Sequence, residues 1–90
     1  MTVIDSALGI DEVLFSNDFI LYPNPANNIL KIKLKEEYEI YRVIIYNLFG
    51  QKVYLTSKNE FDISSLSNGL YLIKVLTTTG LQGVKRFVKE

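Results

Sequence analysis

Acidic side chains gather at one point of this sequence and are the first candidates for chemistry. Glu36, Glu37 and Glu39 lie around Tyr38. Closely spaced carboxylates can work as an acid–base pair or hold a cation through their oxygen atoms. Charged residues also gather wherever a chain turns in solvent between two strands. We interpret the cluster as such a solvated turn and predict no metal site in it.

A second candidate is the short polar stretch that follows Phe61. Asp62 stands near Ser64 and Ser65, whose hydroxyl groups could act as nucleophiles if a base activated them. The chain contains no His and no Cys, so imidazole bases, thiolate nucleophiles and most zinc sites are excluded. A Ser–Lys arrangement stays open, although no spacing in the sequence supports it. We therefore predict no catalytic residue and no cofactor.

Tyrosines could instead line a groove that binds a glycan. Sugar-stacking sites usually favour Trp, which the chain lacks. Tyr46 and Tyr71 lie within strongly apolar stretches, where a ring packs in the core and its hydroxyl reaches a polar partner at the rim. Packing is the role we predict, and glycan binding is the alternative. The tyrosines are Tyr22, Tyr38, Tyr41, Tyr46, Tyr54 and Tyr71.

The overall charge argues against two classes of partner. The chain has ten Lys and Arg residues and ten Asp and Glu residues, which gives a formal net charge of zero. A neutral protein has no electrostatic footprint for nucleic acid or for an anionic membrane. No apolar stretch approaches the roughly 20 residues that are needed to span a bilayer. We expect neither a nucleic-acid partner nor a membrane span.

The elements that must position these side chains are β-strands. In residues 30–35, three aliphatic residues alternate with three lysines, and this period of two indicates a half-buried strand. Residues 41–46 are apolar on both faces beyond Arg42, as expected of a central strand. Residues 70–77 place Tyr71, Ile73 and Val75 on one face. Further strands are predicted to end at Tyr22 and to cover residues 51–55, 61–63 and 84–89, with Val53 and Leu55 facing one way and Lys52 and Tyr54 the other.

Turn signals separate these strands. Asn47 and Gly50 bracket a hairpin turn, Asn68-Gly69 is a strong turn signal, and the chain turns again at Thr79-Gly80. Their spacing of roughly 8–12 residues is typical of β-sandwiches. No long stretch shows the 3.6-residue period of a helix. The sequence therefore predicts an all-β fold, an antiparallel Ig-like β-sandwich of about seven strands.

Residues 1–18 differ from the rest because their apolar spacing fits neither a strand nor a helix. A short extended segment laid on the domain and a short helix over residues 10–15 are both open. We interpret residues 1–18 as a linker from an upstream cargo and residues 19–90 as the folded domain.

Several ordered blocks resemble the C-terminal sorting domain of type IX secretion substrates. The resemblance covers about residues 19–90, and it begins at a strand end where two prolines restrict the backbone around Asn24. Two mild departures are Asn47, where an acidic residue is also common, and the apolar pair Leu48-Phe49 within a turn. The blocks are Leu21-Tyr22-Pro23-Asn24-Pro25-Ala26, Leu30-Lys31-Ile32, Val43-Ile44-Ile45-Tyr46-Asn47, Gly50-Gln51-Lys52-Val53, Phe61-Asp62-Ile63-Ser64, Asn68-Gly69-Leu70-Tyr71-Leu72-Ile73-Lys74-Val75 and Lys85-Arg86-Phe87-Val88-Lys89.

The resemblance implies a non-catalytic secretion signal behind a larger cargo. It implies transit through the periplasm, recognition by an outer-membrane translocon, and a final place at the cell surface or in the medium. It also implies a sortase-like cysteine peptidase that usually removes the domain. Cleavage just before the folded domain would fall among Leu14, Phe15, Ser16, Asn17 and Asp18.

We predict that the translocon recognises the last strand and the adjacent turn. A terminal strand often lies at a sheet edge, where its free backbone groups can pair with a partner strand or weakly with a second copy. Basic side chains would add charge complementarity. The alternative is that this strand only completes the sandwich. The predicted recognition residues are Gly69, Tyr71, Lys85, Arg86, Phe87, Val88 and Lys89, and the structural motif comprises Tyr22, Pro23, Asn24, Pro25, Asn47 and Gly50.

Two other functions compete with the sorting signal. A glycan- or surface-binding accessory module would also be a β-sandwich, with exposed aromatic residues in a groove. A structural stalk domain would stand between other domains of an adhesin.

Overall fold

The computed structural model describes residues 19–90, and this part of the chain folds into seven β-strands. The prediction of an all-β fold is confirmed. Within residues 19–90 no helix is long and apolar enough to cross a membrane. The strands are β1 (Phe19–Tyr22), β2 (Ile29–Leu34), β3 (Ile40–Tyr46), β4 (Lys52–Thr56), β5 (Glu60–Asp62), β6 (Gly69–Thr77) and β7 (Gln82–Lys89).

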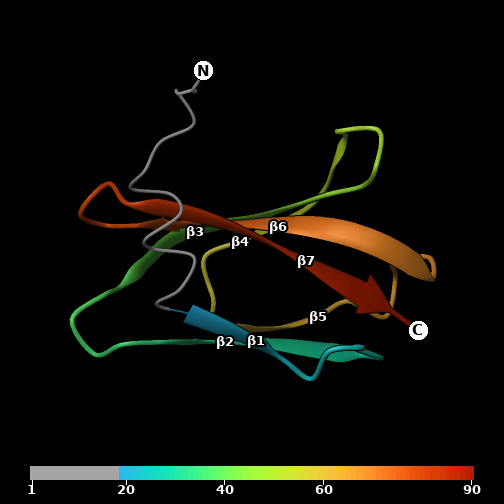
Figure 1. The fold of residues 1–90 in the computed structure, drawn as a ribbon, viewed down its shortest axis with the longest axis horizontal. Coiled ribbons are helices and arrows are strands. Elements are labelled where there is room, and N and C mark those ends of the chain that lie inside the picture. The colour runs from blue at the N-terminus through green and yellow to red at the C-terminus, as the bar shows by residue number, and fades with distance from the viewer. Residues whose placement is uncertain (1–18) are drawn as a thin grey trace, which may run out of the picture.

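Two antiparallel sheets face each other, as Figure 1 shows. The smaller sheet has the strand order β1-β2-β5, and the larger has the order β4-β3-β6-β7. β3 is a central strand, which confirms the expectation drawn from its two apolar faces. β7 lies at an edge of the larger sheet, next to β6. The architecture is therefore the predicted sandwich, with the last strand at an edge.

One core lies between the sheets because each strand turns every second side chain inward. In β2, Leu30 and Ile32 are buried, whereas Lys33 is exposed. In β6, Tyr71, Ile73 and Val75 face the core, as predicted from the alternation. The buried cluster consists of Phe19, Ala26, Leu30, Ile32, Val43, Ile45, Phe61, Ile63, Tyr71, Ile73, Val75 and Phe87.

The facing predicted for β4 is wrong. The pairing register between β3 and β4 shifts between Ile45 and Tyr46, so one extra residue of β4 is accommodated by a β-bulge. Beyond the bulge, Tyr54 pairs with the buried Ile45 and stacks on the ring of Phe61 at 5.3 Å. Leu55 consequently turns to solvent. A bulge inverts the alternation, and the sequence of β4 carries no clear mark of it.

Candidate recognition surface

The turn before β6 and the end of β7 lie side by side, as the predicted recognition surface requires. Gly69 pairs with Lys89, and Leu70 pairs with Val88. Gly69 has a φ of 151°, a backbone conformation that side-chain-bearing residues rarely adopt. Its expected positive φ is confirmed, and glycine is needed here for the backbone.

Two aromatic residues of the predicted surface belong to the core instead. Tyr71 and Phe87 are 7% and 1% exposed, and their rings stack with centroids 5.6 Å apart. The Tyr71 hydroxyl donates a hydrogen bond to the Ser67 carbonyl at 2.7 Å, which confirms the predicted rim partner of a packed tyrosine. A partner protein cannot reach these rings without opening the sandwich.

The basic residues of β7 differ in how far solvent reaches them. Arg86 is exposed on the outer face. Lys85 is half-buried, with its Nζ atom 5.3 Å from the centre of the Phe19 ring. Lys89 is buried, and its Nζ donates to the Glu90 main-chain oxygen at 3.3 Å. Of the three, only Arg86 therefore presents a fully available charge. Of the predicted recognition residues, Gly69, Arg86 and Val88 are accessible to a partner, and Lys85 is partly accessible.

The loop after β1, which contains both prolines, is hydrogen-bonded to the end of β7 through Asn24 and Ala26. We call these contacts the Asn24–Ala26 clasp. Val88 donates its backbone N–H to the Asn24 Oδ1 atom at 3.1 Å and accepts the Ala26 N–H at 2.8 Å. Glu90 N–H donates to the Ala26 carbonyl at 2.7 Å. The two peptide bonds Tyr22–Pro23 and Asn24–Pro25 are cis. The bond from Val88 to Asn24 joins residues that are 64 positions apart in the sequence.

Ala26 has a structural role, although the predicted structural motif did not include it. It is fully buried and forms an isolated parallel bridge with Lys89. A larger side chain would meet the core at this point. The only signal for this role in the sequence is a small apolar residue directly after the second proline.

Asn47 organises the turn between β3 and β4, as its type suggested. Its Oδ1 atom accepts the backbone N–H groups of Phe49 at 2.9 Å and Gln51 at 3.0 Å. Its side-chain amide donates to Gln51 Oε1 at 2.8 Å. Gly50 has a φ of 81° and donates its N–H to the Asn47 carbonyl at 3.0 Å. Asn47 and Gly50 are therefore structural residues that hold the tip between them.

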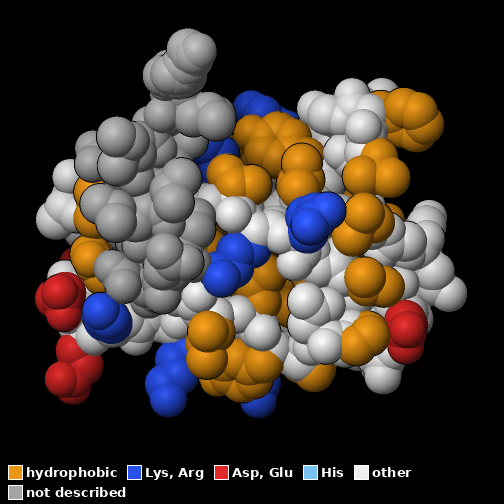
Figure 2. All heavy atoms as spheres, in the orientation of Figure 1, with side chains coloured by type: hydrophobic (Ala, Val, Ile, Leu, Met, Phe, Trp, Pro, Cys, Tyr) orange, Lys and Arg blue, Asp and Glu red, His pale blue; other side chains and the backbone are white. Residues whose placement is uncertain are grey.

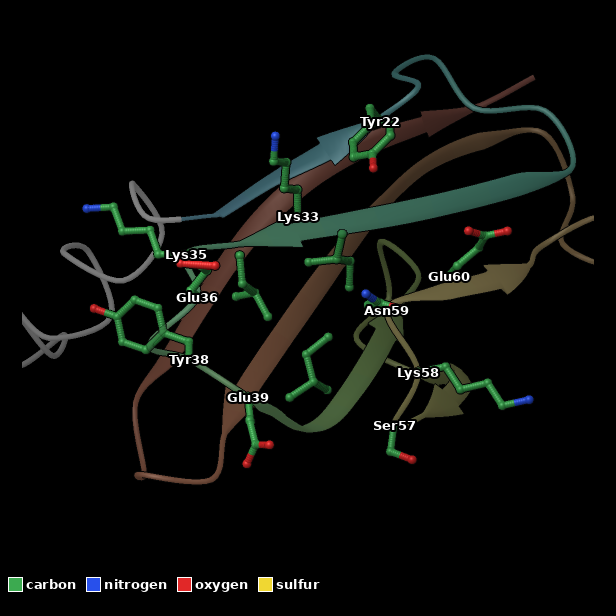
Figure 3. A pocket seen from close by; sticks show the side chains of 13 residues that line it. Tyr22, Lys33, Lys35, Glu36, Tyr38, Glu39, Ser57, Lys58, Asn59 and Glu60 are labelled. Carbon is green, nitrogen blue, oxygen red and sulfur yellow. The ribbon is translucent and has the colours of Figure 1, made fainter.

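The acidic cluster borders an open depression between β2 and the β4–β5 connection. In Figure 3 the side chains of Glu36, Glu39 and Glu60 lie apart and point in different directions, with Lys33, Lys35 and Lys58 around the same depression. Among residues 19–90 no group of three acidic side chains could hold a metal ion. This placement agrees with the interpretation as a solvated turn.

The Asp62 carboxylate serves the local backbone. It accepts the Ser64 N–H at 2.7 Å. The Ser64 hydroxyl, followed by this backbone N–H, lowers the pKa of Asp62 from its ordinary value of 3.8. Asp62 thus stabilises the turn that follows β5.

Two remaining predictions concern cleavage and glycan binding. The predicted cleavage residues Leu14, Phe15, Ser16, Asn17 and Asp18 lie outside the described residues. Of the tyrosines, Tyr22 and Tyr41 are exposed by 42% and 56%, and they belong to different sheets. They do not line a common groove. Tyr22 and the half-buried Tyr38 both border the depression of Figure 3, where their rings lie apart.

A family model described as a secretion system C-terminal sorting domain matches residues 20–90. No curated protein matches the chain in sequence.

Proposed function

The chain belongs to the family of secretion system C-terminal sorting domains, and we propose that the exposed part of β7 is the surface by which the secretion machinery recognises it. The domain is a C-terminal sorting signal for type IX secretion. This role implies contact with the type IX machinery, attachment to an upstream cargo, and export to the cell surface or the extracellular space. Domains of this family are generally non-catalytic, and we infer that this one has no catalysis of its own.

The observation that carries the proposal is the exposure of Arg86 and Val88 on an edge strand. An edge strand offers backbone N–H and C=O groups to a partner strand. Because β7 is antiparallel to β6, the backbone groups of Arg86 point to the same outer edge as those of Val88. The Val88 groups are already bonded to Asn24 and Ala26, so a partner strand would pair with the backbone of Arg86. The Arg86 guanidinium adds charge-assisted hydrogen bonds to a carboxylate of the partner. The clasp at Asn24 and Ala26 holds this edge in one position for recognition.

We infer that the receptor is the outer-membrane translocon, reached after transit through the periplasm. Residues 1–18 link the domain to its cargo, and a sortase-like cysteine peptidase cleaves among residues 14–18. The family match, which begins at residue 20, supports this boundary because it leaves residues 14–18 outside the sorting domain.

Arg86→Glu tests the recognition surface. An exported fluorescent reporter fused to residues 1–90 is expressed in a strain that has the type IX system, and fluorescence is measured at the surface and in the medium. We expect secretion to fall, because the charge reversal removes complementarity from an exposed position. Arg42→Glu is the matched control, since Arg42 is exposed on the same sheet opposite Leu76, at its other end.

Both variants must remain folded, and loss of the translocon must abolish secretion of the parent fusion. Normal secretion of a folded Arg86→Glu fusion would refute β7 as the recognition surface. Truncation of residues 85–90 is a poorer test, because it also removes Phe87 from the core.

We further infer that pairing of two copies through β7 is weak. The Asn24–Ala26 clasp occupies part of the edge that a second β7 would need. Sedimentation of the purified chain should give a monomer at micromolar concentration, and a stable dimer would contradict this expectation.

A further inference from the structure

The tip of the hairpin between β3 and β4 exposes two large apolar side chains. Leu48 is 65% exposed and Phe49 is 89% exposed. In Figure 1 this hairpin projects at the upper right, and Figure 2 shows hydrophobic side chains at the same place. Exposed aliphatic residues are common on proteins, but a phenylalanine this exposed gives nothing to the core.

The tip is held in one conformation by its own hydrogen bonds. The turn is closed by the three side-chain hydrogen bonds of Asn47, two at its Oδ1 atom and one from its amide to Gln51. Two backbone bonds add to them, from Asn47 N–H to the Gln51 carbonyl and from Gly50 N–H to the Asn47 carbonyl. An ordered loop loses less conformational entropy on binding than a loose one does. Leu48 and Phe49 are therefore presented in a preorganised way.

A second turn in the same sheet shows that the turn does not require apolar tip residues. Between β6 and β7, Thr77 N–H donates to the Leu81 carbonyl at 2.9 Å, and Leu81 N–H donates to Thr77 Oγ1 at 3.0 Å. Gly80 has a φ of 93° and donates to the Thr77 carbonyl at 3.1 Å. These bonds repeat those of Asn47, Gly50 and Gln51. The two equivalent tip positions are Thr78 and Thr79, which are polar.

The apolar tip lies at the same end of the sheet as the β7 recognition surface. Tyr46, which precedes the turn, pairs with Leu72 near the start of β6, and Gly69 pairs with Lys89. The Thr77 turn lies at the opposite end, where Thr77 pairs with Ile40. One partner can therefore contact the hairpin tip and the end of β7 together.

The charge around the tip defines the chemistry of that partner. Among the described residues, the four strands of the larger sheet contain Lys and Arg but no Asp or Glu. Lys52 follows the tip and is exposed, as is Arg86. A convex apolar tip beside basic side chains complements a concave apolar site with an acidic rim.

We propose that Leu48 and Phe49 insert into an apolar, acid-rimmed pocket on a protein of the type IX machinery, as a second contact beside β7. This inference rests on recognition of the same sheet end by that machinery. Phe49 is the anchor, since buried aromatic side chains dominate the energetics of protein interfaces.

A transplant of the polar tip tests the proposal. L48T/F49T gives the first turn the tip residues of the second, and T78L/T79F is the reciprocal control at the opposite end. In the reporter fusion with residues 1–90, we expect L48T/F49T to reduce secretion about tenfold or more, the scale of one lost aromatic anchor. T78L/T79F should be secreted normally. L48T/F49T should have the melting temperature of the parent, whereas T78L/T79F loses the 3.0 Å bond between the Thr77 and Thr79 hydroxyl groups and should melt slightly lower.

Photo-crosslinking supplies a readout that does not depend on the folding of a variant. A benzoylphenylalanine replaces Phe49 in the fusion, and in the control it replaces Thr79. The position-49 probe should crosslink to an identified type IX protein, and the position-79 probe should not. Crosslinks only to lipopolysaccharide, only to a second copy, or to nothing would overturn the proposal.

Comparison with Arg86→Glu separates the two hypotheses. If the folded L48T/F49T fusion is secreted normally and the Arg86→Glu fusion is not, the hairpin contact is refuted and the β7 recognition surface stands. If both folded fusions are secreted normally, the hairpin contact and the β7 recognition surface are both refuted.

Discussion

The two sheets share one core but differ on their outer faces. On the smaller sheet, Lys31 stands opposite Glu60 and close to the Tyr22 ring, 5.9 Å from its centre. On the larger sheet, Lys74 stands opposite Ile44, and Arg86 stands opposite Leu72. Lys31 thus finds partners for its charge within the smaller sheet, whereas Lys33 of the same strand stands opposite Ile20. The larger sheet leaves basic groups among aliphatic ones, which is the composition of a surface that meets another protein.

The largest effect should separate the inner and outer faces of β7. Phe87→Ala removes a fully buried ring and should cost about 3–5 kcal/mol of unfolding free energy. Val88→Ala, one residue on and facing outward, should cost less than about 1 kcal/mol. Urea unfolding of the purified chain measures both. Equal losses would mean that the two faces of β7 are not distinct.

The second effect concerns the backbone where β6 begins. Gly69→Val forces a β-branched residue into a φ of 151° and should cost about 1–3 kcal/mol. No atom lies within 4 Å of the added Cβ, so the cost would come from the backbone and not from a clash. The neighbouring Leu70→Val is the control for β-branching. If Gly69→Val unfolds at the same urea concentration as the parent, the strain argument is wrong.

A charge reversal on each sheet tests how the two outer faces differ. Lys31→Glu places a second acid opposite Glu60 and should cost about 0.2–1 kcal/mol of stability. Lys74→Glu meets no acid across the strand and should leave stability nearly unchanged. Thermal unfolding at low salt measures the difference, which should shrink in high salt. A larger loss for Lys74→Glu would reverse the assignment of the two faces.

The smallest effect lies on the smaller sheet and depends on pH. Because the folded-state pKa of Asp62 is lowered, the Ser64 hydrogen bonds stabilise the fold above the ordinary value of 3.8 and are lost as the pH falls through the folded pKa. NMR titration of the Asp62 carboxyl should give a pKa below 3.8, and Ser64→Ala should raise it. A titration midpoint above 3.8 in the parent would contradict the hydrogen-bonded geometry.

Local pattern was enough to predict most strands of this domain. The alternation in β2 and β6 reports directly which side chains face a core, since the period of a strand is two residues. The two apolar faces of β3 indicated its central position for the same reason. The same reasoning gave the wrong facing for Leu55 in β4, because the β-bulge there leaves no visible mark in the sequence. Leu48 and Phe49 stood out from the start as apolar residues in a turn, but their exposure and position could not be read from composition.

Strand order and facing across the sandwich depend on long-range contacts, which a linear pattern does not encode. Only the fold brings Asn24 to Val88 and buries Lys89 beside Ala26. It also leaves Arg86 exposed directly next to the buried Phe87. Residue type and spacing could specify strands, turns and the family resemblance, because those depend on backbone preferences over a few residues. Which charges remain available to a partner depends on how two sheets close over each other, and this is a property of the packed chain.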